Sequence, residues 1–289
     1  MQRIGIIHPG EMGISVAASA RNSGHEVYWA SEGRSPETRD RAVKHGLRDA
    51  ATIANLCKTC AVIVSVCPPG AASEVAGEVL SHGFTGLFVD ANAISPTRAA
   101  DINRRVTAAG ATFVDGGIVG GPAWSPGATW LFLSGPRTEE VAACFSAGPL
   151  GIRIIGTEPG RASALKMCYA AYAKGTTALM AAMLATAEHL GVRDEVYRQW
   201  ARDEAGSVER AEQRVRQASA KAWRFIGEMD EIASTFRDAG LPGDFHAAAG
   251  EVYLRLAPFK NMPGDTPFSE ILAMVGRRAG RAVGTRSDA

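Results

Sequence analysis

One lysine is the first candidate for chemistry in this sequence. Lys166 lies in the first turns of an otherwise apolar helical stretch, residues 162–190, just after the point where the character of the sequence changes. Ligand clefts often form where two domains meet, and a lysine in such a cleft can act as a general acid or base. Lys166 is therefore the candidate for proton transfer. The simpler alternative is a lysine on a helix edge that extends its ammonium into water.

A glycine-containing turn near the start of the chain is the second chemical pattern. An apolar run over residues 3–7 leads into His8-Pro9-Gly10-Glu11-Met12-Gly13, which keeps two glycines of the dinucleotide fingerprint G-x-G-x-x-G. Gly10 would let the backbone approach a pyrophosphate, and Gly13 would let the following helix pack against the strand. The helix N-terminus would offer N–H groups to the phosphates. His8 stands at the first glycine, so the turn is made with a side chain in place; an ordinary strand-to-helix turn is the alternative.

The end of the next predicted strand, residues 26–30, bears on the choice of cofactor. Ser31 occupies the position of the acidic residue that binds the ribose hydroxyls of NAD, whereas Arg34 and Ser35 could hold a 2′-phosphate. The sequence therefore favours NADP(H). NAD(H) is the alternative, with Glu32 as the ribose ligand.

Strand and helix patterns alternate in the first half of the chain. Apolar runs typical of strands cover residues 3–7, 26–30, 61–66, 87–89 and 112–114, and two later runs at 129–134 and 152–155 would extend the same sheet. This alternation predicts an α/β fold, a Rossmann-type doubly wound parallel sheet over residues 1–160. After Gly160 only helical patterns follow, including 207–222, 223–239 and one that begins at Thr266-Pro267. We therefore predict an all-α C-terminal domain over residues 161–289.

Composition narrows the class of function. The chain has 289 residues, of which 46% are hydrophobic and 21% charged, and a net charge of +1. This is ordinary globular composition, and it predicts a small-molecule partner rather than nucleic acid or a membrane. The apolar stretch at 162–187 contains two lysines and many small residues, which favours a buried helix over a membrane span. No secretory signal is visible and the five cysteines are scattered, so we expect a cytoplasmic protein. Cys57 and Cys60 lack a second pair, so we predict no metal site.

Taken together, the motifs resemble those of the β-hydroxyacid dehydrogenases, relatives of 6-phosphogluconate dehydrogenase that include the imine reductases. The resemblance covers most of the chain. It rests on Gly5-x-x-x-x-Gly10-x-Met12-Gly13, Val66-Cys67-Pro68-Pro69, Asp90-Ala91-Asn92-Ala93-Ile94-Ser95-Pro96, Asp115-Gly116-Gly117-Ile118-Val119-Gly120-Gly121, and the segment from Gly160 to Lys166.

The resemblance implies a role for several residues. Cys67, Pro68 and Asn92 would lie along the cofactor, and Lys166 would be the catalytic residue. The predicted substrate contacts are Asn92, Gly120, Gly121 and Lys166.

Three departures from the family pattern stand at the site. Asn92 and Ala93 replace a Ser-Thr pair, Val119 replaces a serine that helps the two glycines hold a substrate carboxylate, and Ala170 replaces the asparagine four residues after the lysine. The sequence therefore leaves the substrate open.

A homodimer is the expected assembly. In the family the resemblance points to, two subunits interlock along the long helix, and a helix that is apolar on nearly every side must be covered. The C-terminal domain would then serve both substrate binding and dimerisation.

The sequence predicts an NADP-dependent oxidoreductase that moves a hydride between NADP(H) and a small alcohol or carbonyl substrate, with Lys166 as general acid or base. An imine reductase on the same fold is one alternative, and a non-catalytic NADP(H)-binding sensor or interaction protein is another. Two groups of residues are expected outside this scheme. The acids Glu228, Asp230 and Glu231 should form a solvated helix face, although one of them could enter the cleft. Trp124 and Trp130 should wall the substrate pocket or belong to the core.

Overall fold

The protein is described by a computed structural model that covers residues 1–260 and 262–277. Its contacts form two compact units. The first contains residues 1–170 and 231–243, and the second contains residues 171–230 and the described residues from 244 onward. The predicted division at residue 160 differs from this grouping, because residues 160–163 bond to Asp115 and Ser134 of the sheet and the segment 231–243 bonds to residues 95–98. Residues 278–289 of the predicted helical domain lie outside the described part.

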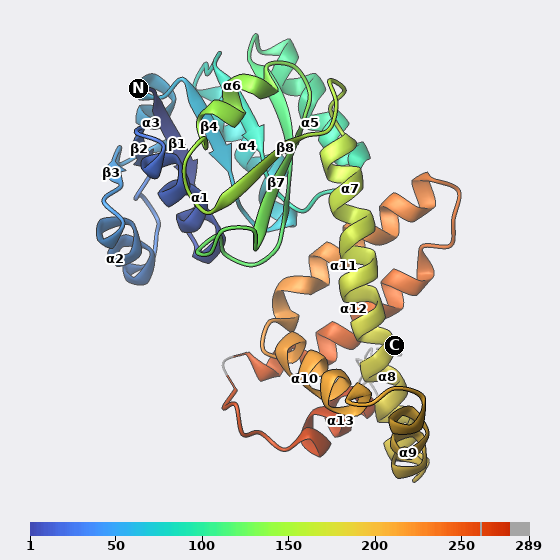
Figure 1. Cartoon of the computed structure of the whole chain (residues 1–289). Coiled ribbons are helices and arrows are strands. Elements are labelled where there is room, and N and C mark those ends of the chain that lie inside the picture. Colours follow the sequence, from blue (N-terminus) through green and yellow to red (C-terminus); the bar gives the residue numbers. More distant parts are fainter. Residues whose placement is uncertain (261, 278–289) are drawn as a thin grey trace, which may run out of the picture. The chain divides into compact units, whose positions relative to one another are not determined.

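The first unit is built on a single sheet (Figure 1). Within the described residues its strand order is β3-β2-β1-β4-β5-β6-β7-β8, and neighbours are parallel except for the antiparallel pair β6–β7. The strands are Arg3–Ile7 (β1), Glu26–Trp29 (β2), Arg48–Asp49 (β3), Val62–Ser65 (β4), Leu87–Asp90 (β5), Thr112–Val119 (β6), Thr129–Ser134 (β7) and Leu150–Ile154 (β8). The predicted Rossmann sheet and its extension by the two later runs are confirmed.

Helices cover both faces of the sheet. One apolar core joins the strands to α1, α2 and α6, and a second core joins them to α3, α4 and α5. The helices of this region are Glu11–Asn22 (α1), Pro36–Lys44 (α2), Ile53–Thr59 (α3), Ala72–Ser81 (α4), Pro96–Ala108 (α5), Thr138–Ala143 (α6) and Arg161–Ala170 (α7), with a short 3-10 turn at Pro69–Ala71 (η1).

Several helices begin at a serine or threonine that caps them. Ser35 and Ser95 each accept a hydrogen bond from a backbone N–H of the first turn, and each is followed by a proline at the first helical position. A side-chain oxygen at this position satisfies one of the four N–H groups that a helix start leaves without a partner. This local chemistry sets where α2 and α5 start at the edge of the sheet.

The second unit is helical throughout its described residues. It contains a π-helical turn at Ala171–Gly175 (η2) and then Thr176–His189 (α8), Arg193–Asp203 (α9), Ser207–Ser219 (α10), Ala222–Asp238 (α11, whose last part belongs to the first unit), Asp244–Leu256 (α12), Ala257–Phe259 (η3) and Phe268–Gly276 (α13). Helix α8 packs against α10, α12 and α13.

Three details of the predicted helices are corrected. The stretch at 162–190 is α7, η2 and α8 in succession rather than one uninterrupted α-helix. Helix α13 begins at Phe268 with Pro267 as its N-cap, because the Thr266 hydroxyl donates to the Pro263 carbonyl instead of capping the helix. Helices α9 and α12 carried no pattern that we had assigned.

Candidate active site

The predicted cofactor residues all lie at the carboxyl edge of the sheet in the first unit. They follow strands β1, β2, β4 and β5, which are neighbours in the order β2-β1-β4-β5. The strand order reverses between β1 and β4. Ligands of open α/β sheets bind in the crevice outside the strand ends at such a switch point.

The turn after β1 has the form that a dinucleotide requires, although its first glycine is missing. His8 takes the left-handed conformation that glycine favours, with φ +63°, and its carbonyl accepts a hydrogen bond of 2.7 Å from the N–H of Gly10. A Cβ on Gly13 would lie 2.4 Å from the His8 carbonyl oxygen, so only glycine fits there. Gly10 is the N-cap of α1, and no side chain caps that helix. The first N–H groups of α1 are therefore available to a phosphate. Pro9 is buried in this turn, whereas Glu11 is exposed and Met12 half-buried.

The loop after β2 contains one partly buried arginine, Arg34. Ser31 is buried and Glu32 is exposed, while the half-buried Arg34 has a buried Nε without a hydrogen-bond partner among the described residues. Ser35 is exposed and caps α2 through its hydroxyl. Arg39 of α2 braces the loop, since it donates to the carbonyls of Ser31 and Arg34 over 2.6 and 3.3 Å.

His8 and Arg34 influence each other electrostatically. Burial and the charge of Arg34 lower the pKa of His8 to about 4. Burial also lowers the pKa of Arg34, which Glu78 and Cys67 partly offset. The groups that interact electrostatically with Arg34 thus include residues that follow β1 and β4. The unpartnered buried nitrogens fit a phosphate of a nicotinamide dinucleotide.

Asn92 ties the loops after β4 and β5 together. Its Oδ1 accepts from the N–H of Cys67, its Nδ2 donates to the Ser65 hydroxyl over 3.1 Å, and its own N–H donates to Asp90 over 3.0 Å. Asn92 is only 2% exposed. The structure therefore places Asn92 as the residue that positions Cys67 and the exposed Pro68, and its predicted contacts with cofactor and substrate stay predictions.

A buried polar row crosses the sheet at the level where the strands end. Ser65, Asp90, Asp115 and Ser134 are register partners on β4, β5, β6 and β7, and all four are 0% exposed. Burial raises the pKa of Asp90 to about 7, and the nearby Asp115 raises it further while hydrogen bonds from Asn92 oppose the shift. One carboxylate oxygen of Asp90 has no hydrogen-bond partner among the described residues. Burial therefore favours the protonated form of Asp90.

Asp115 and Ser134 hold the start of α7. Asp115 accepts hydrogen bonds from the Ser134 hydroxyl at 2.9 Å, the Gly160 N–H at 2.8 Å, and the N–H and hydroxyl of Ser163 at 3.0 and 2.6 Å. The Ser134 hydroxyl accepts from the N–H of Ala162 over 3.0 Å. A carboxylate at a helix N-terminus is favoured both by the free N–H groups and by the helix dipole. This arrangement fixes the first turn of the helix that carries the candidate lysine.

Lys166 lies one turn further along α7, against strand β6. A Cβ on Gly117 would be 2.6 Å from the carbonyl oxygen of Ala162 and 3.1 Å from the Cβ of Lys166. Gly117 therefore lets α7 lie directly on the strand. Lys166 is half-buried and has polar contacts of its own.

The loop after β6 presents backbone groups. Gly120 and Gly121 are exposed, and Gly120 has φ +120° with no room for a side chain, because a Cβ would meet the Ala128 carbonyl oxygen at 2.4 Å. Val119 beside them is half-buried. Lys166 and the loop that contains Gly120 and Gly121 thus both adjoin β6, which is compatible with the predicted substrate contacts.

Two expectations about neighbouring residues are wrong or refined. Glu231 is 5% exposed rather than solvated: it accepts from the N–H of Ser95 at 2.8 Å and pairs with Arg98 at 2.6 Å. Glu228 is also buried, and only Asp230 is exposed as expected. Trp124 and Trp130 do not belong to the core, since their exposed fractions are 50% and 40%. Trp124 stacks on His45, with the ring centroids 5.1 Å apart.

No pattern in the sequence predicts the contact of Glu231 with α5. Arg98 also donates to the Pro69 carbonyl over 3.2 Å, so one ion pair connects the segment 231–243, the start of α5 and the loop after β4. The partners are more than a hundred positions apart, and helical periodicity marks neither of them.

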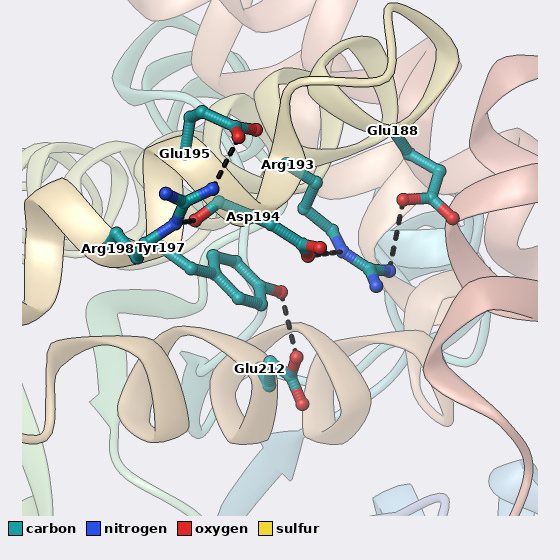
Figure 2. A network of polar contacts seen from close by, with 7 residues as sticks. All are labelled: Glu188, Arg193, Asp194, Glu195, Tyr197, Arg198 and Glu212. Atoms are coloured by element: carbon teal, nitrogen blue, oxygen red, sulfur yellow. Dashed lines mark hydrogen bonds and ion pairs between the residues drawn. The ribbon is translucent and has the colours of Figure 1, made fainter.

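The second unit contains two polar clusters of its own. Lys174 in the π-helical turn pairs with the buried Glu228 and lies over the ring of Phe225, 4.6 Å from its centroid. Figure 2 shows the other cluster, in which α9 is bonded to the end of α8 and to α10. There Arg193 pairs with Glu188 at 3.1 Å, and the Tyr197 hydroxyl donates to Glu212 at 2.8 Å. These contacts join η2 to α11, and α9 to both α8 and α10.

Residues 1–260 and 262–277 contain neither a candidate metal site nor a membrane-spanning helix. No group of three or more His, Cys, Asp or Glu side chains there is placed to hold a metal ion. No helix in the same residues is long and apolar enough to cross a membrane.

Comparison with known families matches both parts of the chain. Residues 3–146 match the NAD binding domain of 6-phosphogluconate dehydrogenase, and residues 187–256 match a domain of unknown function, DUF1932. A 28.5 kDa protein of Methanothermus fervidus is 28% identical over 67% of this chain and 74% of its own length. The mitochondrial 3-hydroxyisobutyrate dehydrogenase of Drosophila melanogaster is 26% identical over 49% of this chain, an alignment that spans 44% of the fly enzyme.

Solved structures share the fold over nearly the full length. The conserved protein MTH1747, described as similar to 3-hydroxyacid dehydrogenases, is 29% identical with a TM-score of 0.66 and covers 89% of this chain and 97% of its own. The Mycobacterium tuberculosis 3-hydroxyisobutyrate dehydrogenase is 17% identical with a TM-score of 0.70, over 96% of this chain and 100% of its own. The Streptomyces aurantiacus imine reductase is 21% identical with a TM-score of 0.54, again over 96% and 100%. The chain therefore belongs to the 6-phosphogluconate dehydrogenase-like superfamily of NAD(P)-dependent dehydrogenases and reductases, which includes the β-hydroxyacid dehydrogenases and the imine reductases.

Proposed function

We propose that this oxidoreductase uses NADP(H) to interconvert a small alcohol and the corresponding carbonyl compound, with Lys166 as the general acid or base. The position of Lys166 carries the proposal. It is a half-buried lysine beside Gly117, on a helix whose first turn is fixed by Asp115. A general acid must be held in place to donate in the transition state, and this lysine is so held.

The proton transfer assigned to Lys166 follows from simple charge balance. When bound, the nicotinamide cofactor supplies the hydride for reduction and accepts it in oxidation. As the carbonyl carbon is reduced, negative charge develops on its oxygen, and the Lys166 ammonium donates one proton from Nζ to that oxygen. The lysine is left as a neutral amine and regains its proton from solvent. In oxidation the neutral amine accepts the hydroxyl proton.

Two sets of residues support the choice of ligands. Gly10 and the uncapped start of α1 would hold the pyrophosphate, and Arg34 with the exposed Ser35 would hold a 2′-phosphate. Gly120 and Gly121 would offer backbone N–H groups to an acidic or polar part of the substrate.

An imine reductase is the second candidate. Val119 stands where the resembling dehydrogenases have a serine that helps hold a carboxylate, and the fold is shared with an imine reductase over 96% of this chain. A site with a weaker hold on a carboxylate is compatible with an uncharged imine substrate.

A substrate screen tests the function. The protein would be mixed with NADPH and with aldehydes, keto acids and cyclic imines, and the loss of NADPH absorbance would be followed. Turnover of aldehydes or keto acids is the expected result, and turnover of cyclic imines alone would favour the second candidate. NADPH binding without turnover of any class would contradict both and favour a non-catalytic NADP(H)-binding sensor.

We also propose that the second unit mediates a homodimer and contributes to substrate binding. Four exposed apolar residues follow one another along η2 and α8 at spacings of seven, four and seven, a pattern that keeps them on one helix face. They are Tyr172, Leu179, Met183 and Leu190, with exposures of 70%, 63%, 37% and 65%.

Light scattering tests the assembly. The expected mass at about micromolar concentration is twice the chain mass of 30.4 kDa. Leu179→Glu should give monomers, whereas Val43→Glu, a matched change of the 74% exposed valine on α2, should not. A mass of 30.4 kDa for the unmodified protein would contradict the dimer.

A further inference from the structure

The turn after β1 does not require the side chain of His8. His8 holds φ +63°, a conformation that glycine adopts freely and that costs another residue about 1–2 kcal/mol. Glycine would therefore make the same turn with less strain. The imidazole is the only thing that a histidine adds.

That imidazole is half-buried and incompletely bonded. Its Nδ1 is buried without a hydrogen-bond partner among the described residues, and the same holds for the Nε of Arg34. Buried polar atoms in proteins are nearly always paired, and each one left unpaired costs about 1–3 kcal/mol. Two such nitrogens, on side chains of which one acts electrostatically on the other, therefore indicate that a hydrogen-bond acceptor binds here.

The charges around the pair agree with an anion as that acceptor. Arg34, from the β2–α2 loop, is the charged group that acts on His8. Glu78 of α4 and Cys67 of the β4–α4 loop act on Arg34. With its pKa at about 4, the imidazole is neutral in the free protein at physiological pH. Without a ligand, the arginine and the histidine thus disfavour each other's charge.

We propose that His8 is a phosphate ligand of the dinucleotide, and that it takes up a proton as the phosphate binds. The inference rests on the proposed cofactor site and adds to it a residue and a proton that the family fingerprint does not contain. The phosphate oxygen accepts a hydrogen bond from the imidazole, and one proton moves from solvent to the second ring nitrogen. The proton comes from hydronium or a buffer acid, whose bond to it breaks as the new N–H bond of the imidazolium forms.

The direction of the pH dependence follows from the charges. A phosphate beside the imidazole favours its protonated form, so the pKa of His8 is higher in the complex than in the free protein. Affinity therefore rises as the pH falls through the pKa of the complex toward the pKa of the free protein. Because a phosphate monoester itself titrates near pH 6, in the opposite direction, a variant without the imidazole has to supply the reference.

Two phosphates of the dinucleotide could occupy this place, the 2′-phosphate of NADP and the pyrophosphate. Two small probes separate them: 2′,5′-ADP carries the 2′-phosphate and a single 5′-phosphate, whereas 5′-ADP carries the pyrophosphate group and no 2′-phosphate. Proton uptake with 2′,5′-ADP alone identifies the 2′-phosphate, and uptake with 5′-ADP identifies the pyrophosphate end.

The test is calorimetric titration of the full-length protein at about pH 6 and about pH 8.5, in buffers of different ionisation enthalpy. The slope of binding enthalpy against buffer enthalpy counts the protons taken up. His8→Gly keeps the turn without a side chain. His8→Asn keeps a donor that tolerates the left-handed conformation but cannot be protonated.

We expect the unmodified protein to take up part of a proton and to bind 2′,5′-ADP at least about tenfold more tightly than His8→Gly near pH 6, with a smaller difference at high pH. His8→Asn should retain part of the affinity and lose the proton uptake. If His8 only shapes the turn, His8→Gly will bind as tightly as the unmodified protein or more tightly, and the inference is overturned.

The same titrations separate this inference from the proposed cofactor preference. A preference for 2′,5′-ADP over 5′-ADP that is unchanged in His8→Gly would leave the NADP proposal standing and remove the role of His8. Proton uptake that disappears in His8→Gly would keep the role of His8 even if the unmodified protein bound 2′,5′-ADP and 5′-ADP equally tightly, a result that would count against the NADP preference alone.

Discussion

The buried polar groups within β6 and after β1 are arranged in opposite ways. Within β6, Asp115 accepts four hydrogen bonds from its surroundings. At the end of β1, His8 and Arg34 each keep a buried nitrogen without a partner in the described part of the chain. The first group is complete in the protein alone, and we propose that a ligand completes the second. Under the proposed function, the saturated contacts belong to groups that hold the helix of Lys166 in position, and the unsatisfied ones belong to groups that bind the cofactor.

The largest expected effect comes from breaking the saturated group. Asp115→Ala leaves the Ser134 hydroxyl, two helix N–H groups and the Ser163 hydroxyl without their acceptor in a fully buried position. Loss of a buried hydrogen-bonded charge should lower the free energy of unfolding by about 3 kcal/mol or more. Urea unfolding measures the change.

A control for this variant is Ser134→Ala, which removes one acceptor for the Ala162 N–H and one donor to Asp115 and should cost about 1–2 kcal/mol. The description of Asp115 as a helix anchor is wrong if Asp115→Ala unfolds like the unmodified protein.

Replacement of Lys166, the proposed general acid, should have the next largest effect, on turnover. Lys166→Met keeps the apolar stem but has no proton to donate, so turnover should fall by at least about 100-fold, or about 2.7 kcal/mol. Lys166→Arg should not restore it, because a guanidinium does not release its proton near neutral pH. Steady-state kinetics with the substrate found by the screen measures both.

Binding of NADPH and the unfolding free energy serve as controls for Lys166→Met, and neither should change much. Turnover near that of the unmodified protein would instead assign the acid to another group, such as Tyr169 or a carboxyl group downstream.

Asp90 combines features of the saturated and the unsatisfied groups, because one of its carboxylate oxygens is hydrogen-bonded and the other has no partner in the described residues. The pH dependence of stability tests its role. Because its pKa is raised to about 7 in the folded protein, the folded state holds a proton that the unfolded chain has already released above about pH 4. The contribution of Asp90 to stability is thus present at low pH and is lost as the pH rises from about 4 to about 7.

Asp90→Asn cannot ionise and should abolish this loss. Relative to the unmodified protein, the variant should gain about 3 kcal/mol in unfolding free energy between about pH 4.5 and about pH 8. Equal pH profiles for the two proteins would contradict the buried, proton-binding role of Asp90.

Local patterns in the sequence were sufficient to predict the doubly wound sheet and the alternation of strands and helices along the chain. The strands are apolar runs, and the turn after β1 retains Gly10 and Gly13, so both could be recognised from neighbouring residues alone. Strand β3 escaped because it has only two residues, Arg48 and Asp49, and both are charged.

The arrangement of the site could be predicted only in part. Lys166 was found through a motif, but its anchoring through Ser134 and the register of Asp90 beside Asp115 depend on how distant strands pair. The burial of Glu231 depends on a partner in α5, and an isolated helix gives a charged residue no reason to be buried.

The smallest expected effect tests the incomplete group. Arg34→Ala removes one of two cationic contacts with a phosphate while His8 and the start of α1 remain, so only part of the binding energy should be lost. We expect the preference for NADPH over NADH, proposed to be at least about tenfold or about 1.4 kcal/mol, to fall close to one. Fluorescence titration with the two cofactors measures the ratio. Arg39→Ala is the matched control, because this exposed arginine donates to loop carbonyls and should alter the affinity for both cofactors alike. Equal affinity of the unmodified protein for NADPH and NADH would remove the preference itself, and Glu32 would then be the residue to examine as the ribose ligand. A preference that survives in Arg34→Ala but disappears in Arg39→Ala would instead move the phosphate site from the inward-facing arginine to the face of α2.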